Sequence, residues 1–194
     1  MSKLSRTTVV EVALEILDEV GLDAVSTRRI AQRLGVEQPS LYWHFPKKAD
    51  LLTAMAEAAL AGHVSRPLPE AGQDWRAWFA SNTGSFRTAL LAHRDGARLH
   101  AGTVPRAESL ARVLGKMDFL YASGVPERAA QIAMVSASRF TIGCVLEQQA
   151  DEDQSATTGD PDQPSPPFSH TEAFEQGLAM LIAGIPAADP PAAG

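Results

Sequence analysis

Residues 25–45 read VSTRRIAQRLGVEQPSLYWHF, and this stretch decides the fold. Ser26 is a preferred N-terminal helix cap and Gly35 a preferred stop, so a short helix is predicted from Ser26 to about Leu34. Pro39 is tolerated in a first helical turn, which favours a second short helix over residues 37–44. Two short helices joined by a brief turn containing glycine form the helix-turn-helix pattern.

The rest of the chain also has helical periodicity. Apolar residues recur at intervals of three and four, and no convincing alternation typical of a strand occurs, so the fold class is predicted to be all-α. Thr8 and Glu11 are expected to form a capping box at the start of the first helix. The expected helices, besides the two short ones, cover residues 8–20, 48–63, 74–91, 94–100, 106–122, 127–149 and 170–184.

Three domains or segments are expected. Residues 1–47 are expected to form a helix-turn-helix domain, and residues 48–184 a larger helical domain. Within it, residues 150–168 are rich in Asp, Ser and Pro and are expected to be a mobile acidic loop. The Ala/Pro-rich residues 185–194 are expected to be a disordered tail.

Composition restricts the function classes. The 194 residues are 45% hydrophobic and 21% charged, as in ordinary soluble globular proteins. No run of 18 or more apolar residues occurs, so no transmembrane helix is predicted, and acidic residues interrupt the first 20 residues where a signal peptide would be apolar. The single cysteine, Cys144, fits a reducing compartment, so a cytoplasmic location is expected.

Charge is distributed unevenly. The net charge is −6, but residues 24–50 hold five Lys and Arg against two acidic residues, or +3. A basic patch on an acidic chain fits a small DNA-reading head on a larger body, although charge alone favours a solvated helix face.

The second short helix carries the residues expected to read DNA. Gln38 and Tyr42 share a face, and a glutamine amide pairs with an adenine edge in the major groove. Pro39 adds apolar contact, and Ser40 is expected to alter base preference at one position. The expected phosphate contacts, some beside the positive end of the preceding helix, come from Thr27, Arg28, Trp43, His44 and Lys48.

Leu41 faces the opposite way and should pack in a core with Leu17, Ile30 and Leu34. A short amphipathic helix that only covers a core would explain Leu41. It would not explain the bulky run Tyr42-Trp43-His44 beside Gln38.

Residues 25–36 and 38–45 resemble the head of the TetR family of repressors. The similarity continues through Ser85-Phe86-Arg87, residues 90–97, Gly102-Thr103 and residues 143–147, where it is to the tetracycline-responsive members. It spans about residues 4–149 and partly resumes near 170–184. The resemblance implies that residues 1–47 are a DNA-binding domain and residues 48–184 a ligand-binding and dimerisation domain. The resemblance implies a homodimer that binds double-stranded operator DNA, with half-sites one helical turn apart. It also implies that the two long C-terminal helices pair between subunits, with Ile132, Val135 and Phe140 as candidates, unless these side chains form an intramolecular core.

The resemblance further implies a magnesium ion chelated by a tetracycline-like inducer, with His100 as the protein ligand of the metal. Thr103 and Glu147 would hold the waters of the ion. The other pocket residues carried over are His63, Val64, Asn82, Phe86, Pro105 and Lys116. Inducer binding would then move the loop near 100–105 and, through the helix at 48–63, the DNA-binding head.

This sequence departs from the family pattern at three pocket positions. Val64 stands where those members have a histidine, Lys116 where they have a glutamine, and Val104 where they have an arginine. The nearby His63 would substitute only if its helix end were remodelled. A lysine here would bend to solvent, pair with an acid or bind an anionic ligand. A repressor of the same family that senses an unrelated small molecule is therefore the main alternative.

Two other classes are disfavoured by sequence. The chain has no glycine-rich phosphate loop, no HExxH and no G-x-S-x-G, so an enzyme is not expected. A protein that only sequesters a drug would not need the set from Gln38 to His44.

Overall fold

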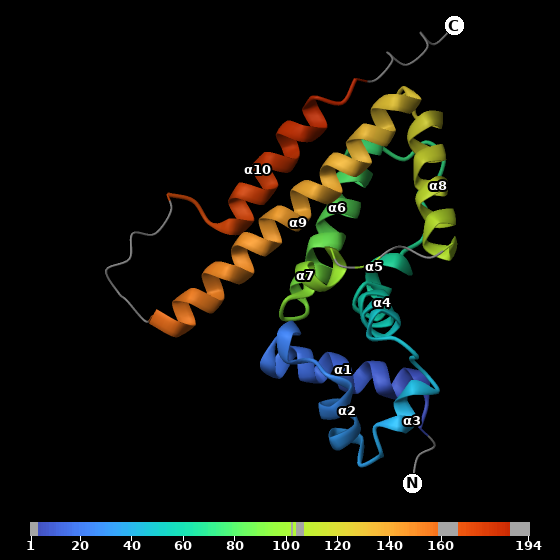
Figure 1. Ribbon diagram of the computed structural model, residues 1–194. Coiled ribbons are helices and arrows are strands. Elements are labelled where there is room, and N and C mark those ends of the chain that lie inside the picture. The colour runs from blue at the N-terminus through green and yellow to red at the C-terminus, as the bar shows by residue number, and fades with distance from the viewer. Residues whose placement is uncertain (1–3, 102, 104–106, 159–166, 187–194) are drawn as a thin grey trace, which may run out of the picture. The chain divides into compact units, whose positions relative to one another are not determined.

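The computed structural model describes residues 4–101, 103, 107–158 and 167–186, and these are helical with no strand, which confirms the all-α fold class. The chain divides into two compact units (Figure 1). The first unit comprises Met1–Gly62 and Thr88–Val104, and the second comprises His63–Arg87 and Pro105–Gly194. The expected domain boundaries at 47/48 and 184/185 stay a prediction.

The first unit begins with α1 (Arg6–Val20), followed by the short 3-10 helix η1 (Leu22–Ala24). The expected capping box at Thr8 is wrong. The Ser5 side chain is the cap and accepts a hydrogen bond from the Thr8 backbone N–H, so the helix begins two residues earlier than expected. Helix α1 packs against α2 (Thr27–Leu34) and α4 (Lys48–Ala59), which enclose its apolar face.

The helix-turn-helix element forms as expected. Ser26 caps α2 by accepting from the Arg29 N–H, and Gly35 ends it in the left-handed conformation, with φ of 66°. Helix α3 (Pro39–Tyr42) is shorter than expected because the chain turns out of it at Trp43. Leu41 and Phe45 are 1% and 2% exposed, and Leu41 joins the predicted core with Leu17 and Ile30.

The expected helix over 48–63 is divided. Helix α4 ends at Ala59, with Leu60 as its cap, and a separate turn, α5 (Ala61–Val64), carries the next residues. Helix α6 (Trp75–Leu91) follows, and its last residues lead to α7 (Gly96–Ala101). Gly96 has no substitute here, because a Cβ would lie 2.1 Å from the Leu90 carbonyl oxygen.

The second unit contains α8 (Ala107–Ala122), α9 (Glu127–Thr158) and α10 (His170–Ala183), with most of α6. Both α8 and α10 pack against α9. Its core is aromatic: Trp78 meets Phe119 edge-on with ring centroids 5.0 Å apart, and Phe140 stacks on Phe174 at 5.6 Å.

Two expectations for the C-terminal part need correction. Helix α9 continues to Thr158, so the first nine residues of the expected acidic loop are helical. Residues 159–166 lie outside the described residues. Ile185, expected in the disordered tail, is 9% exposed and packs in the core of the second unit, whereas residues 187–194 are outside the description.

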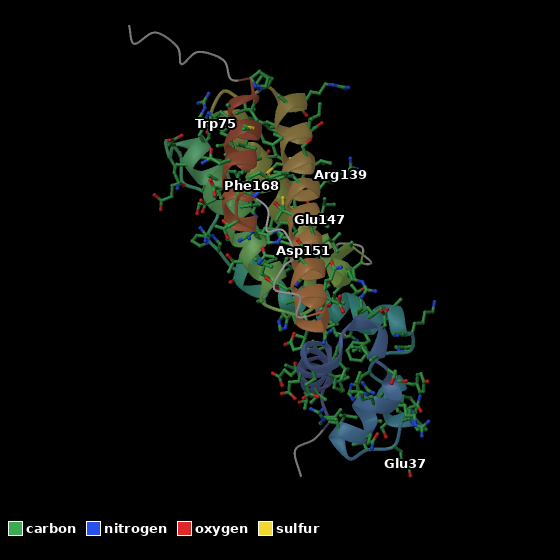
Figure 2. All side chains as sticks on the ribbon, turned by 90° about the vertical axis from the view of Figure 1, so that its left-hand side faces the viewer. Glu37, Trp75, Arg139, Glu147, Asp151 and Phe168 are labelled. Carbon is green, nitrogen blue, oxygen red and sulfur yellow. The ribbon has the colours of Figure 1, made fainter. Side chains whose placement is uncertain are left out.

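One helix in the described part of the chain has the length and composition needed to cross a membrane. It is the α9 segment Glu127–Gln154, with mean hydropathy 1.4. The sequence criterion missed it because charged residues such as Arg139 interrupt the apolar run, and Figure 2 shows that side chain extending away from the α9 ribbon. Some of its apolar residues, such as Ala130 and Ala137, pack in the core of the second unit, whereas Ile132 and Val135 are exposed.

Candidate nucleic-acid interface and ligand site

The first unit presents an exposed polar and aromatic surface at α3 and the turn that precedes it. Tyr42 is 47% exposed and Trp43 is 90% exposed, although both directly follow buried Leu41. Figure 2 shows Glu37, in the turn before α3, pointing away from the ribbon. A large aromatic side chain left in water has no role in the core of this unit, so this surface is suited to a partner.

A hydrogen-bond network orders the candidate DNA-reading residues. Gln38 Nε2 donates to Thr27 Oγ1 at 2.9 Å and to the Tyr42 hydroxyl at 3.2 Å. These bonds connect the first turn of α2 with α3. The side-chain oxygen of Gln38, Oε1, takes no part in them. The His44 backbone carbonyl accepts from Arg6 Nη1 at 2.6 Å, which fixes the end of α3 to α1.

The remaining candidate DNA contacts flank this network. Arg28 lies exposed in the first turn of α2, and Lys48 is the exposed first residue of α4. Pro39 is exposed and Ser40 is half-buried. The structure thus places the nine candidates in the first turns of α2 and α4, along α3 and directly before and after α3, all in the first unit.

His100 lies at the end of α7, also in the first unit. Its ring is half-buried, and burial lowers the pKa of His100 below its usual value, so the imidazole is neutral at pH 7. Its backbone carbonyl accepts from Thr103 Oγ1 at 2.9 Å, which closes the turn after the helix. A neutral imidazole is the form that binds a metal.

No group of three or more His, Cys, Asp or Glu side chains that would hold a metal occurs in the described ranges. A magnesium ion at His100 would therefore have one protein nitrogen and would need oxygen ligands from a chelating molecule and water. Pro105, a predicted pocket residue, lies outside the described residues.

The other predicted ligand residues belong to the second unit. His63 and Val64 lie on α5, Asn82 and Phe86 on α6, and Lys116 on α8. Val64, Asn82 and Lys116 are half-buried and Phe86 is 8% exposed. Glu147 is exposed on α9.

His63 is turned toward α6 and α8 because α5 is separate from α4. Its Nδ1 lies 2.7 Å from Ser85 Oγ, its Nε2 lies 3.4 Å from Lys116 Nζ, and its ring centroid is 5.5 Å from that of Phe86. His63 thus contacts Ser85 and Phe86 of α6 and Lys116 of α8, and its role in ligand binding stays a prediction. Sequence reasoning missed Ser85, Arg66 and Arg112 as neighbours of this group, because only the tertiary fold brings them together.

Lys116 lies among other cations. Burial, together with the guanidinium groups of Arg112 and Arg66, lowers the pKa of Lys116 to about 8. Arg112 Nη2 donates to the backbone carbonyl of Arg66, and Arg66 Nη2 donates to Ser81 Oγ at 2.9 Å.

The chain resembles known regulators over both parts of this arrangement. Residues 9–55 match the family described as bacterial regulatory proteins, tetR family, and residues 68–164 match the tetracyclin repressor-like C-terminal domain. The tetracycline repressor protein class A from transposon 1721 of Escherichia coli is 42% identical over 95% of this chain and 92% of its own length. The chain belongs to the TetR family of bacterial regulatory proteins.

Solved TetR-family structures are similar throughout. A TetR-family transcriptional regulator from Streptomyces coelicolor is 60% identical, with a TM-score of 0.72 over 93% of this chain and 97% of that one. TetR(class A) in complex with 5a,6-anhydrotetracycline and magnesium is 43% identical, with a TM-score of 0.79 over 93% and 97%. A TetR variant from Acinetobacter baumannii AYE in complex with minocycline is 46% identical, with a TM-score of 0.82 over 94% and 96%.

Proposed function

We propose that this TetR-family chain is a cytoplasmic transcriptional repressor that binds a palindromic operator as a homodimer. The observation that carries the proposal is the exposed surface of Tyr42 and Trp43, held over buried Leu41 and Phe45 and ordered by Gln38. Gln38 and Tyr42 meet base edges in the major groove. Arg28 and Lys48 contact phosphates on either side and fix the register.

The inducer proposed for the repressor is a tetracycline-like molecule chelated to magnesium. Magnesium, when bound, neutralises and orients the chelating oxygens of the inducer. His100 contributes the protein nitrogen, with Thr103 and Glu147 as partners of bound water. Support comes from the neutral, half-buried His100 and from the relative whose structure contains 5a,6-anhydrotetracycline and magnesium.

Packing within the first unit supplies a route from His100 to the DNA-reading surface. Leu99, next to His100, is 2% exposed and belongs to the same core as Leu51 and Met55 of α4. Helix α4 packs on both α7 and α1. A ligand that favours one position of α7 therefore shifts α4 and the head by its differential affinity for the two states.

The test is a tetracycline fluorescence titration of the purified protein, first with magnesium and then with excess EDTA. We expect saturable binding that EDTA abolishes and that His100→Ala weakens by about 100-fold, the effect of losing a metal ligand contact. A footprint on the operator should disappear as tetracycline saturates the protein. Absence of binding at tens of micromolar would contradict the inducer, and absence of any footprint would contradict the repressor.

The second candidate is a TetR-family repressor for a different small molecule. The cations around Lys116 favour it, because a neutral region of a ligand gains nothing from a half-buried lysine beside two arginines. In that case the footprint persists in tetracycline while the DNA-binding head functions normally.

A further inference from the structure

Three basic side chains of the second unit converge near the middle of α8. Arg66 follows α5, and Arg112 and Lys116 are four residues apart on one face of α8. In the described part of the chain, none of the three forms an ion pair with a carboxylate. Grouped cations that lack a counterion repel one another, and the fold gains nothing from holding them together.

The hydrogen-bond directions show which protons this group leaves available. The Ser85 hydroxyl donates to the Asn82 backbone carbonyl at 2.9 Å, so its oxygen accepts from Nδ1–H of His63 at 2.7 Å. That bond fixes the neutral tautomer of His63 and leaves Nε2 as an acceptor for Lys116 Nζ at 3.4 Å. An ammonium group has three donors, so two N–H bonds of Lys116 remain for another acceptor.

Arg112 adds a further donor. Its Nη2 is bound to the Arg66 carbonyl, but its Nε is buried and has no hydrogen-bond partner among the described residues. A buried N–H without a partner costs about 1–3 kcal/mol, so native proteins rarely keep one without a reason. The structure therefore places unused donors of two cations on the same face of α8, beside the ring of His63.

We propose that Lys116 and Arg112 bind an oxyanion group of the small-molecule ligand, with Arg66 adding positive charge and with His63 Nε2 holding the Lys116 ammonium in place. The class of group is a carboxylate or phosphate, because either offers several acceptor oxygens to converging N–H donors. Phe86, whose ring lies 5.5 Å from that of His63, supplies an apolar wall for a ring that carries the anion. The inference rests on the proposed sensor function, but it concerns a different part of the ligand from the magnesium chelate.

The test is isothermal titration calorimetry of the full-length protein at pH 7, with benzoate and inorganic phosphate as separate probes and chloride holding the ionic strength constant. We expect at least one of the two to bind with millimolar or better affinity. Lys116→Gln should weaken that binding by about tenfold or more, the loss of one charge-assisted contact, whereas Lys116→Arg should keep most of it. Tighter binding of benzoate identifies a carboxylate ligand, and tighter binding of phosphate identifies a phosphate ester.

Arg128→Gln is the matched control, because it removes one positive charge from an exposed position of the same unit. It should leave anion binding unchanged. Equal binding by wild type and Lys116→Gln would overturn the proposal, as would the absence of binding by both probes at tens of millimolar. Circular dichroism of each variant verifies that it folds.

A parallel tetracycline titration separates this inference from the proposed function. Lys116→Gln should keep or improve magnesium-dependent tetracycline binding while it loses the anion. Anion binding without tetracycline binding would overturn the proposed inducer and leave the anion site standing. Tetracycline binding without anion binding would overturn the anion site and leave the proposed inducer standing.

Discussion

The backbone N–H of Leu22 donates a 2.7 Å hydrogen bond to Oδ2 of Asp95, a residue 73 positions away in the sequence. Asp95 has φ of 55°, in the left-handed region, and its Oδ1 accepts from Arg98 Nη1 at 3.0 Å. Arg98 also binds Asp23 of η1 at 3.1 Å. The start of α7, the helix that ends near His100, is therefore fastened to η1 by one side chain held in an unusual conformation.

Asp95→Ala should destabilise the protein for two reasons. It leaves the Leu22 N–H without its acceptor, and alanine tolerates the positive φ at this position less well than aspartate does. The expected loss is about 2 kcal/mol in the free energy of unfolding, measured by urea denaturation. Asp95→Asn keeps an acceptor and tolerates the left-handed conformation, so it should lose less than half as much. Equal losses would show that the carboxylate charge, rather than the hydrogen bond and conformation, is the stabilising feature.

Tyr42→Ala and Leu41→Ala should separate DNA binding from folding. Tyr42 is exposed, so its loss should leave stability within about 0.5 kcal/mol while it weakens operator binding by about tenfold or more. Leu41 is 1% exposed in the core, and truncating it should cost about 2–5 kcal/mol. Thermal unfolding and an operator mobility-shift assay on both variants measure the two effects. A Tyr42→Ala protein with full operator affinity would remove α3 from the interface.

Lys48→Gln should weaken binding to all DNA sequences alike, because a phosphate contact does not depend on the base. The slope of log K against log salt should fall by about one unit. Fluorescence anisotropy at several salt concentrations, with operator and scrambled duplexes, measures it. A loss of affinity for the operator alone would instead place Lys48 at a base edge.

Anion binding near Lys116 should depend on pH in one direction. The pKa of Lys116 is about 8, so the ammonium form that binds an anion is lost as the pH rises through that value. His63, Arg112 and Arg66 face the same group, and the arginines stay charged throughout this range. Benzoate affinity should therefore fall by about tenfold between pH 7 and pH 9 in wild type, and not in Lys116→Arg, whose guanidinium does not titrate there.

The same pKa predicts a stability change. Folding lowers the pKa of Lys116, so keeping this lysine charged at pH 7 costs folding free energy. The cost disappears as the pH rises from about 8 toward the pKa of the unfolded chain. Lys116→Gln should raise stability at pH 7 by about 1 kcal/mol after allowance for solvent screening, and by less at pH 10. A destabilised variant would show that Lys116 stabilises the fold.

The fold was largely predictable because the residues that start and end its helices act locally. Ser26, Gly35 and Pro39 act through their own backbone and side-chain geometry, so the helix-turn-helix followed from their spacing. Local signals failed where two alternatives competed. Ser5 and Thr8 are both good caps, and only the structure shows that Ser5 is used. Acidic residues around Glu152 suggested a loop, yet neither proline nor glycine interrupts residues 150–158, so α9 continues through them.

The candidate site was predictable only residue by residue. The sequence showed that Lys116 departs from the family pattern. It left open whether this lysine extends to solvent, pairs with an acid or binds an anionic ligand. Which neighbours it meets depends on the break at Leu60, because that break frees α5 to bring His63 against α6 and α8. No sequence motif identifies Arg112 as a neighbour of Lys116. Arg112 becomes a candidate only because its Nε is buried in the packed structure.

The last prediction concerns the dimer. Ile132 and Val135, two of the sequence candidates, are 55% and 45% exposed on α9, and Met180 on α10 is 73% exposed. An apolar helix face of this kind suits a partner subunit. Phe140, the third sequence candidate, instead stacks on Phe174 within the chain. In a two-fold dimer each substitution occurs twice, so Ile132→Glu buries two charges and should weaken dimerisation by about 100-fold in sedimentation equilibrium. Leu114→Glu, at an equally exposed leucine on α8, is the control and should remain a dimer. If Leu114→Glu dissociates and Ile132→Glu does not, the subunits pair through α8 rather than through α9 and α10.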